Sequence, residues 1–326
     1  MNSFISLISD ADLHKEFTRD IRDRYLDQKF LYSNPENADR YYELHHANKS
    51  KIIKRFVNED YYEFLKKNLG KKKQHIAFVS LGCGNAEKEK IALSKLTQEG
   101  WEFFYIGVDA SERMLELAEK NLSNLPFEQH FIKTDFIDDA FKDEIVELTK
   151  HSDRRLLSFL GNTLGNVNQT NIADILYNSL DKGDLLWLDV VVRRDLSMEN
   201  EMKTFNRYAS YLKDDEVKRF FFAPLADIKV PFDSGEIMMK MDKEYSVGAI
   251  IFTFYFHFNE KVVLSIDNEK VHFLPAEEIK LQKIRVYHPE TMIKFFNEHE
   301  FNLVNHALKG EKGQFMFIKG SDKDQE

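Results

Sequence analysis

The 326-residue sequence contains a single cysteine, Cys83. One cysteine excludes the framework of intrachain disulfides that stabilises many small secreted proteins. The first sixteen residues, MNSFISLISDADLHKE, are too polar for a secretory signal peptide, and their apolar run is too short. A soluble protein in the reducing cytoplasm is therefore expected.

Long hydrophobic runs and an excess of positive charge are also missing. No stretch reaches the roughly 20 apolar residues that a membrane-spanning helix needs, so no membrane partner is predicted. The net charge is −9, whereas a nucleic-acid binder needs a concentrated basic surface to contact phosphates. These absences favour an ordinary globular protein that binds neither a membrane nor nucleic acid.

The central part of the chain alternates short apolar strands with amphipathic helices. Such alternation predicts a parallel sheet with right-handed crossovers, and hence an α/β core over residues 71–192. Ser111 is a plausible N-cap for the second of the helices. The predicted strands are 76–81, 103–108, 131–133, 156–160 and 185–192, and the predicted helices are 87–99, 111–121 and 168–179.

The flanking segments have different patterns. Residues 1–70 are predicted to be mostly helical, with apolar side chains at helical spacing at 52–56 and 61–65. Residues 193–287 contain SVGAIIFTFYFHF, whose period of two predicts a strand of an antiparallel insertion. These two segments are expected to form an α+β substrate lobe. Residues 288–326 are predicted to return to the core as a helix and a strand hairpin that completes the sheet in antiparallel fashion.

Three successive strands of the core end in residues suited to a nucleoside. Gly82-Cys83-Gly84 follows the first strand, Asp109 ends the second, and Asp135-Phe136 ends the third. Ligands of open parallel sheets bind at this edge, where glycines admit close backbone approach and an acid accepts ribose hydroxyls. The second acid is suited to an adenine amino group and the aromatic ring to the base. Each feature alone is a weak signal, but the three in order predict a nucleoside cofactor.

The turn after the first strand distinguishes between two cofactors. A dinucleotide requires a longer G-x-G-x-x-G turn for its pyrophosphate, and here Glu87 occupies the third glycine position. An acid would repel pyrophosphate but suits a sulfonium. The sequence therefore favours S-adenosylmethionine, with S-adenosylhomocysteine as product. The expected fold is a class I methyltransferase, a Rossmann-like seven-stranded sheet whose last hairpin is antiparallel.

Several motifs resemble those of the histidine-specific methyltransferase family. They are LGCGNAEKEK, YIGVDAS, KTDF, FLGNTLGN, LWLDVVV and, more loosely, KFLYSNPENADRYYEL. The best-known member of that family trimethylates the α-amino group of free L-histidine for ergothioneine synthesis. The resemblance implies a transferase that methylates the amino group of a small, amino-acid-like substrate.

Residue by residue, the resemblance implies a set of contacts. Asn166, in FLGNTLGN, would hold the amino-acid head group, since an amide both donates and accepts hydrogen bonds. Tyr32 falls where the family has a tyrosine near the reacting amine, although a packed aromatic residue is an equally good interpretation. Gly161 lets the backbone pass close to the ligands. The cofactor would contact Gly82, Gly84, Lys90, Asp109, Asp135 and Phe136.

Two segments depart from the family pattern. LHHANKSK replaces a Tyr-Tyr-Pro-Thr-Arg-like segment, and Gln282-Lys283-Ile284 replaces the Glu-x-Ser that reads imidazole. Gln282 remains the substrate-binding candidate there, but Ile284 offers no hydrogen bond to an imidazole nitrogen. These departures argue against free histidine as the substrate.

Other interpretations stay open at this point. A protein or other macromolecule as substrate, or a non-catalytic S-adenosylmethionine-binding protein, is compatible with the same motifs. No metal is predicted, because His45-His46 has the wrong spacing for two ligands on one helix face. Cys83 is interpreted as a packing residue. The strand face with Thr253, Tyr255 and His257 is suited to a pocket wall or, better, to a solvent-facing surface.

Overall fold

A computed structural model describes residues 3–46, 60–70, 72, 74–193 and 197–320. Its centre is an eight-stranded sheet, in which β13 alone runs antiparallel to its neighbours. The strands, in spatial order, are β1 (Ser3–Ser6), β4 (Glu128–Lys133), β3 (Glu102–Asp109), β2 (His75–Leu81), β5 (Arg154–Phe159), β6 (Leu185–Val191), β13 (Lys312–Lys319) and β12 (Phe301–Lys309).

Seven of these strands, from β4 to β12, are those expected for a class I methyltransferase, and the antiparallel last hairpin is confirmed. The eighth, β1, was not predicted. It extends the edge of the sheet by pairing in parallel with β4, from Ser3 opposite His130 to Ser6 opposite Lys133. Four residues are too few to show a period, and the pairing depends on a strand more than 120 residues away, so no local pattern marks this segment as a strand.

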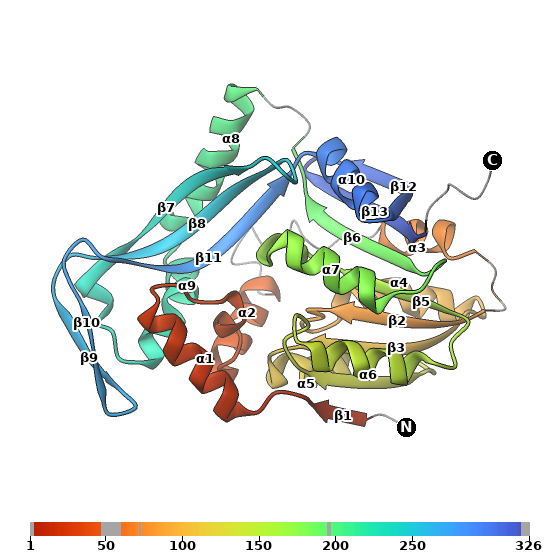
Figure 1. Cartoon of the computed structure of the whole chain (residues 1–326), viewed down its shortest axis with the longest axis horizontal. Helices are drawn as coiled ribbons and strands as arrows, with labels where there is room; N and C mark the ends of the chain where they lie inside the picture. The colour runs from red at the N-terminus through yellow and green to blue at the C-terminus, as the bar shows by residue number, and fades with distance from the viewer. Residues whose placement is uncertain (1–2, 47–59, 71, 73, 194–196, 321–326) are drawn as a thin grey trace.

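Helices cover both faces of the sheet (Figure 1). On one face α3 (Tyr61–Asn68), α4 (Glu87–Gln98) and α5 (Glu112–Leu122) pack on Phe78, Tyr105 and Trp187. On the other, α6 (Asp139–Thr149), α7 (Gln169–Ser179) and α10 (Pro289–Glu298) share a separate core with the strands. Ser111 caps α5 as predicted, since its side chain accepts a hydrogen bond from the backbone amide of Met114. The predicted helical spacing at 52–56 lies outside the described residues.

A second lobe lies beside this core, at the left of Figure 1. Its three-stranded antiparallel sheet has the order β11-β8-β7, and a separate hairpin, β9-β10, turns through Asp267 and Asn268, both at positive φ. The strands are β7 (Gly235–Glu244), β8 (Ala249–Phe258), β9 (Val262–Ile266), β10 (Glu269–Phe273) and β11 (Glu278–Tyr287). The helices are α1 (Asp10–Arg22), α2 (Pro35–His46), α8 (Met198–Ala209) and α9 (Asp215–Asp227), with short 3-10 turns η1 (Gln28–Leu31), η4 (Ser210–Lys213) and η5 (Phe232–Ser234).

The insertion 193–287 is thus not wholly β, because α8 and α9 occupy its first part. These helices cover the apolar face of β8 that the alternation predicted. Phe252, Phe254 and Phe256 are fully buried. Tyr208 of α8 stacks on Phe252 with ring centroids 4.5 Å apart, and Phe221 of α9 lies 4.7 Å from Phe254. A row of phenylalanines needs such a cover, since exposed apolar surface is costly.

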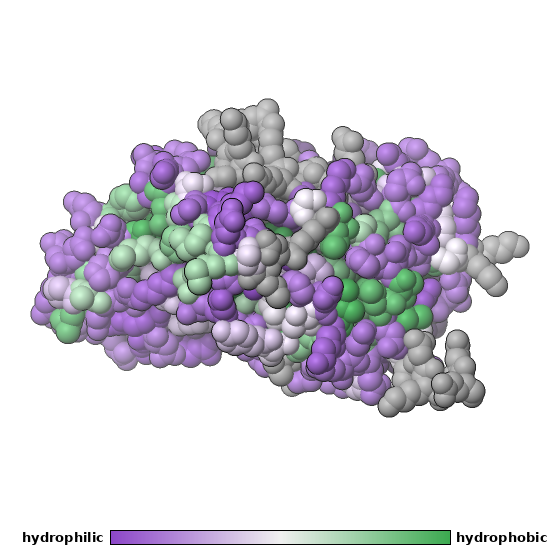
Figure 2. Space-filling view, turned by 90° about the horizontal axis from the view of Figure 1, so that it is seen from above, coloured by the Kyte–Doolittle hydropathy of each residue, from purple (hydrophilic) through white to green (hydrophobic). Residues whose placement is uncertain are grey.

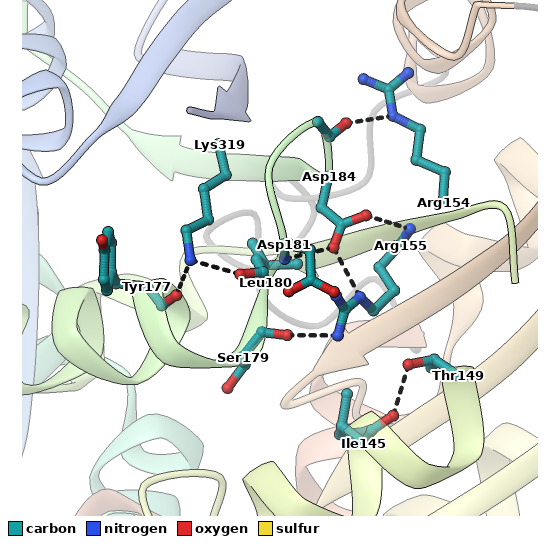
Figure 3. A network of polar contacts seen from close by, with 11 residues as sticks. Ile145, Thr149, Arg154, Arg155, Tyr177, Ser179, Leu180, Asp181, Asp184 and Lys319 are labelled. Carbon is teal, nitrogen blue, oxygen red and sulfur yellow. Dashed lines mark hydrogen bonds and ion pairs between the residues drawn. The ribbon is translucent and has the colours of Figure 1, made fainter. Parts of the chain in front are cut away.

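A network of ion pairs and hydrogen bonds fastens the amino-terminal ends of β5 and β6 (Figure 3). Arg155 donates from its backbone amide to Asp184 at 2.8 Å and from Nε at 2.7 Å. Both side chains are buried. Lys319 of β13 donates to the carbonyls of Tyr177 and Leu180 at the end of α7. This network lies at the end of the strands opposite to their carboxyl edge.

The surface seen from above is largely hydrophilic, with hydrophobic residues in separate groups (Figure 2). Among the residues that the structure describes, no helix has the length and apolar character needed to cross a membrane.

Candidate active site

A cavity of about 290 Å³ lies at the carboxyl ends of β2, β3, β4 and β5, facing the N-terminal turn η1 and helix α2. Sites for small molecules typically begin at about 300 Å³. The cavity brings together most of the residues named from the sequence, but its lining includes neither Lys90 nor Gln282. The named residues that line it are Tyr32, Gly82, Gly84, Asp109, Asp135, Phe136, Gly161 and Asn166.

Asp109 is held firmly at the end of β3. Its Oδ2 accepts a hydrogen bond from the backbone amide of Gly84 at 3.0 Å, and its Oδ1 accepts from that of Ser111 at 2.9 Å. These bonds fix the carboxylate between the loop after β2 and the N-terminus of α5. Burial raises the pKa of Asp109 to about 6. At neutral pH it is therefore an ionised acceptor in a fixed orientation.

Asp135 connects the core to the N-terminal lobe. Its Oδ2 lies 2.6 Å from Nζ of Lys29, which also lies 2.5 Å from Glu16. Burial raises the pKa of Asp135, while the Lys29 ammonium opposes that shift. Phe136 follows, with its ring 5.5 Å from that of Phe159. Lys29 is the first residue of the motif KFLYSNPENADRYYEL, but no sequence pattern connects it with Asp135, which lies 106 positions away.

Two glycines allow the loops after β2 and β5 to pack closely. Gly82 has φ +63°, and a Cβ on it would lie 2.5 Å from Cγ2 of Thr163. Gly161 has φ +73°, and a Cβ there would overlap the end of the Lys88 side chain. Both conformations are unfavourable for residues with a side chain. The glycines thus bring β2, β5 and the first turn of α4 together around the cavity.

Lys88, rather than Lys90, lines the cavity. The two positions lie about 200° apart around the axis of α4, since each residue of an α-helix turns by about 100°. Lys88 extends over Gly161, and within the described chain it has no ion-pair partner. The motif LGCGNAEKEK contains both lysines, so the helical position decides between them.

The two Gly-Asn pairs of FLGNTLGN have different roles. Asn162 is buried at φ +68°, and its Oδ1 accepts from the amide of Val191 at 3.0 Å while its Nδ2 donates to the carbonyl of Arg285 at 3.4 Å. It therefore joins the loop to β6 and β11. Asn166 ends the 3-10 turn η3 (Thr163–Asn166) and lines the cavity. Its amide makes no hydrogen bond within the described residues.

Tyr32 lies in a cluster of aromatic residues at the cavity wall. Its ring centroid is 5.0 Å from that of Tyr41 and 5.7 Å from that of Phe220. Burial raises the pKa of Tyr32 well above its ordinary value, and the nearby Tyr41 and Asp109 add to the shift. The phenol is consequently neutral throughout the physiological range. Tyr32 is thus a packed aromatic residue that also lines the cavity, and its place near a reacting amine stays a prediction.

Strand β11 places Lys283 in the cavity wall and turns Gln282 away from it. A bulge at Leu281 shifts the register, so that Gln282 lies opposite Phe254 and Lys283 opposite Thr253. Directly opposite residues share a face of the sheet, which puts Gln282 on the phenylalanine side. There its Oε1 is buried and has no partner among the described residues. The geometry does not support substrate contact by Gln282.

The remaining candidates lie outside the cavity lining or are inert. Thr253, Tyr255 and His257 do not line the cavity. Cys83 does, but burial raises the pKa of its thiol well above the ordinary value, as expected for a packing residue. In the described part of the chain there is no group of three or more His, Cys, Asp or Glu residues placed to hold a metal.

The donor set of this cavity fits S-adenosylmethionine. Asp109 supplies an oriented acceptor for hydroxyl groups, and Lys88 supplies a cation suited to a carboxylate. Gly84 has open space where a Cβ would stand, so a ligand can approach its backbone. No backbone pyrophosphate cradle is needed for such a ligand.

The chain was compared with known proteins by sequence and by structure. No curated protein matches the chain significantly in sequence. Among solved structures, a Pyrococcus horikoshii protein has 11% identity and a TM-score of 0.45, with 86% of this chain and 97% of that one covered. A SAM-dependent methyltransferase from Methanosarcina mazei has 13% identity and a TM-score of 0.41, covering 78% and 96%. The 1,6-didemethyltoxoflavin N1-methyltransferase from Burkholderia thailandensis has 8% identity and a TM-score of 0.42, covering 87% of each chain.

The sequence profile of one family spans most of the chain. The profile described as "Histidine-specific methyltransferase, SAM-dependent" matches residues 58–319, which include every strand of the central sheet except β1, and β7 to β11 of the second lobe. The chain therefore belongs to the histidine-specific, S-adenosylmethionine-dependent methyltransferase family.

Proposed function

We propose that this methyltransferase acts on the amino group of a small amino-acid-like molecule. One observation carries the proposal: the unpaired amide of Asn166 shares a single cavity with Asp109 and Asp135. A residue suited to an amino-acid head group thus lies beside the residues suited to the cofactor. An amide can donate to a carboxylate and accept from an amine at the same time.

On the cofactor side, S-adenosylmethionine supplies a methyl group already activated by its sulfonium. Asp109 is proposed to accept hydrogen bonds from the ribose hydroxyls, and Asp135 to accept one from the adenine amino group. Phe136 packs on the adenine ring, and Lys88 pairs with the carboxylate of the methionine portion. Lys88 replaces Lys90 in this proposal because Lys88 lines the cavity.

On the substrate side, the protein mainly has to orient a neutral amine, whose lone pair attacks the methyl carbon. Tyr32 is proposed to position that amine. Because burial keeps its phenol neutral, the hydroxyl oxygen accepts an N–H hydrogen bond rather than abstracting a proton. The ammonium form of the substrate therefore has to lose its proton before the methyl group is transferred.

Gln28, a residue with no motif to mark it, is a second positioning candidate. It lines the cavity, is 9% exposed, and its Oε1 has no partner among the described residues. An unpaired buried acceptor costs about 1–3 kcal/mol. An N–H donor from the bound substrate would relieve that cost.

Two measurements test the proposal. Calorimetric titration with S-adenosylhomocysteine should show binding that Asp109→Ala abolishes and Asn166→Ala preserves. A screen of free amino acids and amines with labelled S-adenosylmethionine should then show methyl transfer to a small molecule, which Asn166→Ala removes. Labelling confined to protein in a lysate, or no labelling at all, would contradict the assignment of a small-molecule substrate.

A further inference from the structure

Strand β11 carries three cations on one face. Lys280 lies opposite Tyr255, Lys283 opposite Thr253 and Arg285 opposite Ile251. Under strict alternation, residues three apart in a strand point to opposite faces. The extra residue of the bulge at Leu281 is what turns Lys280 and Lys283 to the same side. Of these three cations, Lys283 lines the cavity.

Only one of the three cations is neutralised within the described structure. Arg285 lies 2.5 Å from a carboxylate oxygen of Glu244. Lys283 has no acid within ion-pair distance, and neither has Lys280, which is 6% exposed and places its ammonium 3.3 Å from the centre of the Tyr25 ring. Lys283 thus brings to the cavity wall a cation that the described residues leave unpaired, with Lys280 beside it on the same face of β11.

The surrounding charges do not replace a counter-ion. Asp20 and Asp27 attract the Lys280 ammonium from beyond contact distance, but burial and the charge of Lys283 lower the pKa of Lys280 to about 7. Burial, followed by the charge of Arg285, lowers the pKa of Lys283, against the attraction of Glu244 and Asp27. Buried cations are costly unless paired. A bound anion would stabilise these ammonium groups, whereas a neutral or cationic side chain would not.

The position of Lys283 relates it to the head-group residue. Arg285, two residues along β11, donates from Nη1 to the carbonyl of Gly165 at 3.2 Å. This bond fastens the loop that carries Asn166 to the strand that carries Lys283. Both side chains line the same cavity. One end of a bound molecule can therefore meet Asn166 while its other end meets Lys283.

Building on the proposed function, we propose that the substrate is an acidic amino acid whose side-chain carboxylate pairs with Lys283. The acids of the cavity do not oppose this arrangement. Asp135 is paired with Lys29, and Asp109 accepts hydrogen bonds from two backbone amides. Asp27, the acid of the cavity lining that attracts Lys283, already accepts a hydrogen bond from the backbone amide of Lys29.

Isosteric ligands provide the direct test. Calorimetric titrations with glutamate, glutamine, aspartate, asparagine and histidine should be run on the protein with and without S-adenosylhomocysteine. At least one acid is expected to bind ten times more tightly or better than its amide and than histidine. Equal or tighter binding of the amides or histidine, or no binding of either acid, would overturn the proposal.

Variants assign the preference to one side chain. Lys283→Met should abolish the discrimination between glutamate and glutamine, and Lys283→Arg should retain it. Lys270→Met, on the exposed hairpin strand β10, is the matched control and should behave like the wild type. A preference for acids that survives in Lys283→Met would refute the role of Lys283.

The proposed function and the acidic substrate can each be rejected without the other. If S-adenosylhomocysteine does not bind, the proposed function is wrong, while titrations without it still measure the charge preference. If S-adenosylhomocysteine binds and neutral amino acids are methylated, the methyltransferase assignment stands and the acidic substrate is rejected. Circular dichroism of each variant identifies any that has simply failed to fold.

Discussion

The ammonium of Lys29 lies 2.6 Å from the carboxylate of Asp135, and this ion pair joins η1 of the N-terminal lobe to the carboxyl edge of the central sheet. Both side chains are largely buried, at 12% and 15% exposed. The pair therefore links the folding of the lobe to the charge of a residue proposed to contact the cofactor.

Loss of the Lys29 side chain should weaken both stability and cofactor binding. Lys29→Met leaves Asp135 buried without its cation, which costs about 3–5 kcal/mol for such a pair and raises the pKa of Asp135 further. Urea unfolding and titration with S-adenosylhomocysteine measure the two effects. Lys29→Met combined with Asp135→Asn should recover much of the stability but not the affinity. Wild-type stability in the single variant would contradict a structural role for the pair.

Cofactor affinity should fall in mild acid. Burial raises the pKa of Asp109 to about 6, and hydroxyl donors bind its ionised form. Affinity for S-adenosylhomocysteine should therefore drop about tenfold from pH 7 to pH 5 through this group. Asp109→Asn should bind weakly and lose this part of the pH dependence. A profile in the variant that parallels the wild type would assign the effect to another group, such as Asp135.

The raised pKa of Asp109 affects folding stability in the opposite direction, because acid favours the folded state through this group. The folded-state pKa of Asp109 lies above the ordinary 3.8, so the folded protein holds this proton more tightly than the unfolded chain. The contribution of Asp109 should thus favour folding at low pH and decrease as pH rises toward 6, then stay constant. Comparing the ligand-free protein with Asp109→Asn over this range isolates the contribution.

Substitution of two lysines of α4 should have different effects on affinity for S-adenosylhomocysteine. Lys88→Met removes a cation from the cavity and is expected to reduce affinity for S-adenosylhomocysteine at least tenfold. Lys90→Met, two residues further along α4, is the matched control and should leave affinity within about twofold, because Lys90 does not line the cavity. The reverse result would restore the assignment made from the motif alone.

The Arg155–Asp184 network should matter for stability and not for binding (Figure 3). Asp184→Ala removes the buried carboxylate of Arg155 and leaves only the exposed Asp181 as its ion-pair partner. The free energy of unfolding should decrease by up to about 3–5 kcal/mol. Affinity of the folded variant for S-adenosylhomocysteine should be unchanged. Lys294→Ala, which removes an exposed pair with Glu298, should cost less than about 1 kcal/mol. A similar loss in both variants would contradict the distinction.

Local patterns in the sequence were sufficient for most strands of the central sheet, but not for β1 or for helix α6. The alternation of apolar strands and amphipathic helices predicted β2 to β6, because each of these elements has its own period. The strand ends at Gly84, Asp109 and Asp135 converge on one cavity, since parallel strands bring their carboxyl ends to the same edge. Period two likewise predicted the buried phenylalanine face of β8. It did not show what covers that face, so α8 and α9 were missed.

Only the tertiary structure shows the features that depend on a partner distant in the sequence. Strand β1 exists through pairing with β4, and Lys29 becomes relevant through Asp135. The choice between Gln282 and Lys283 is the clearest case. A bulge is a property of two strands in register, so no local pattern in QKI reveals that Leu281 displaces Gln282 to the apolar side. The sequence alone predicted a methyltransferase fold whose strand ends suit a nucleoside, whereas only the packing of β11 against β8 decided that Lys283, and not Gln282, lines the cavity.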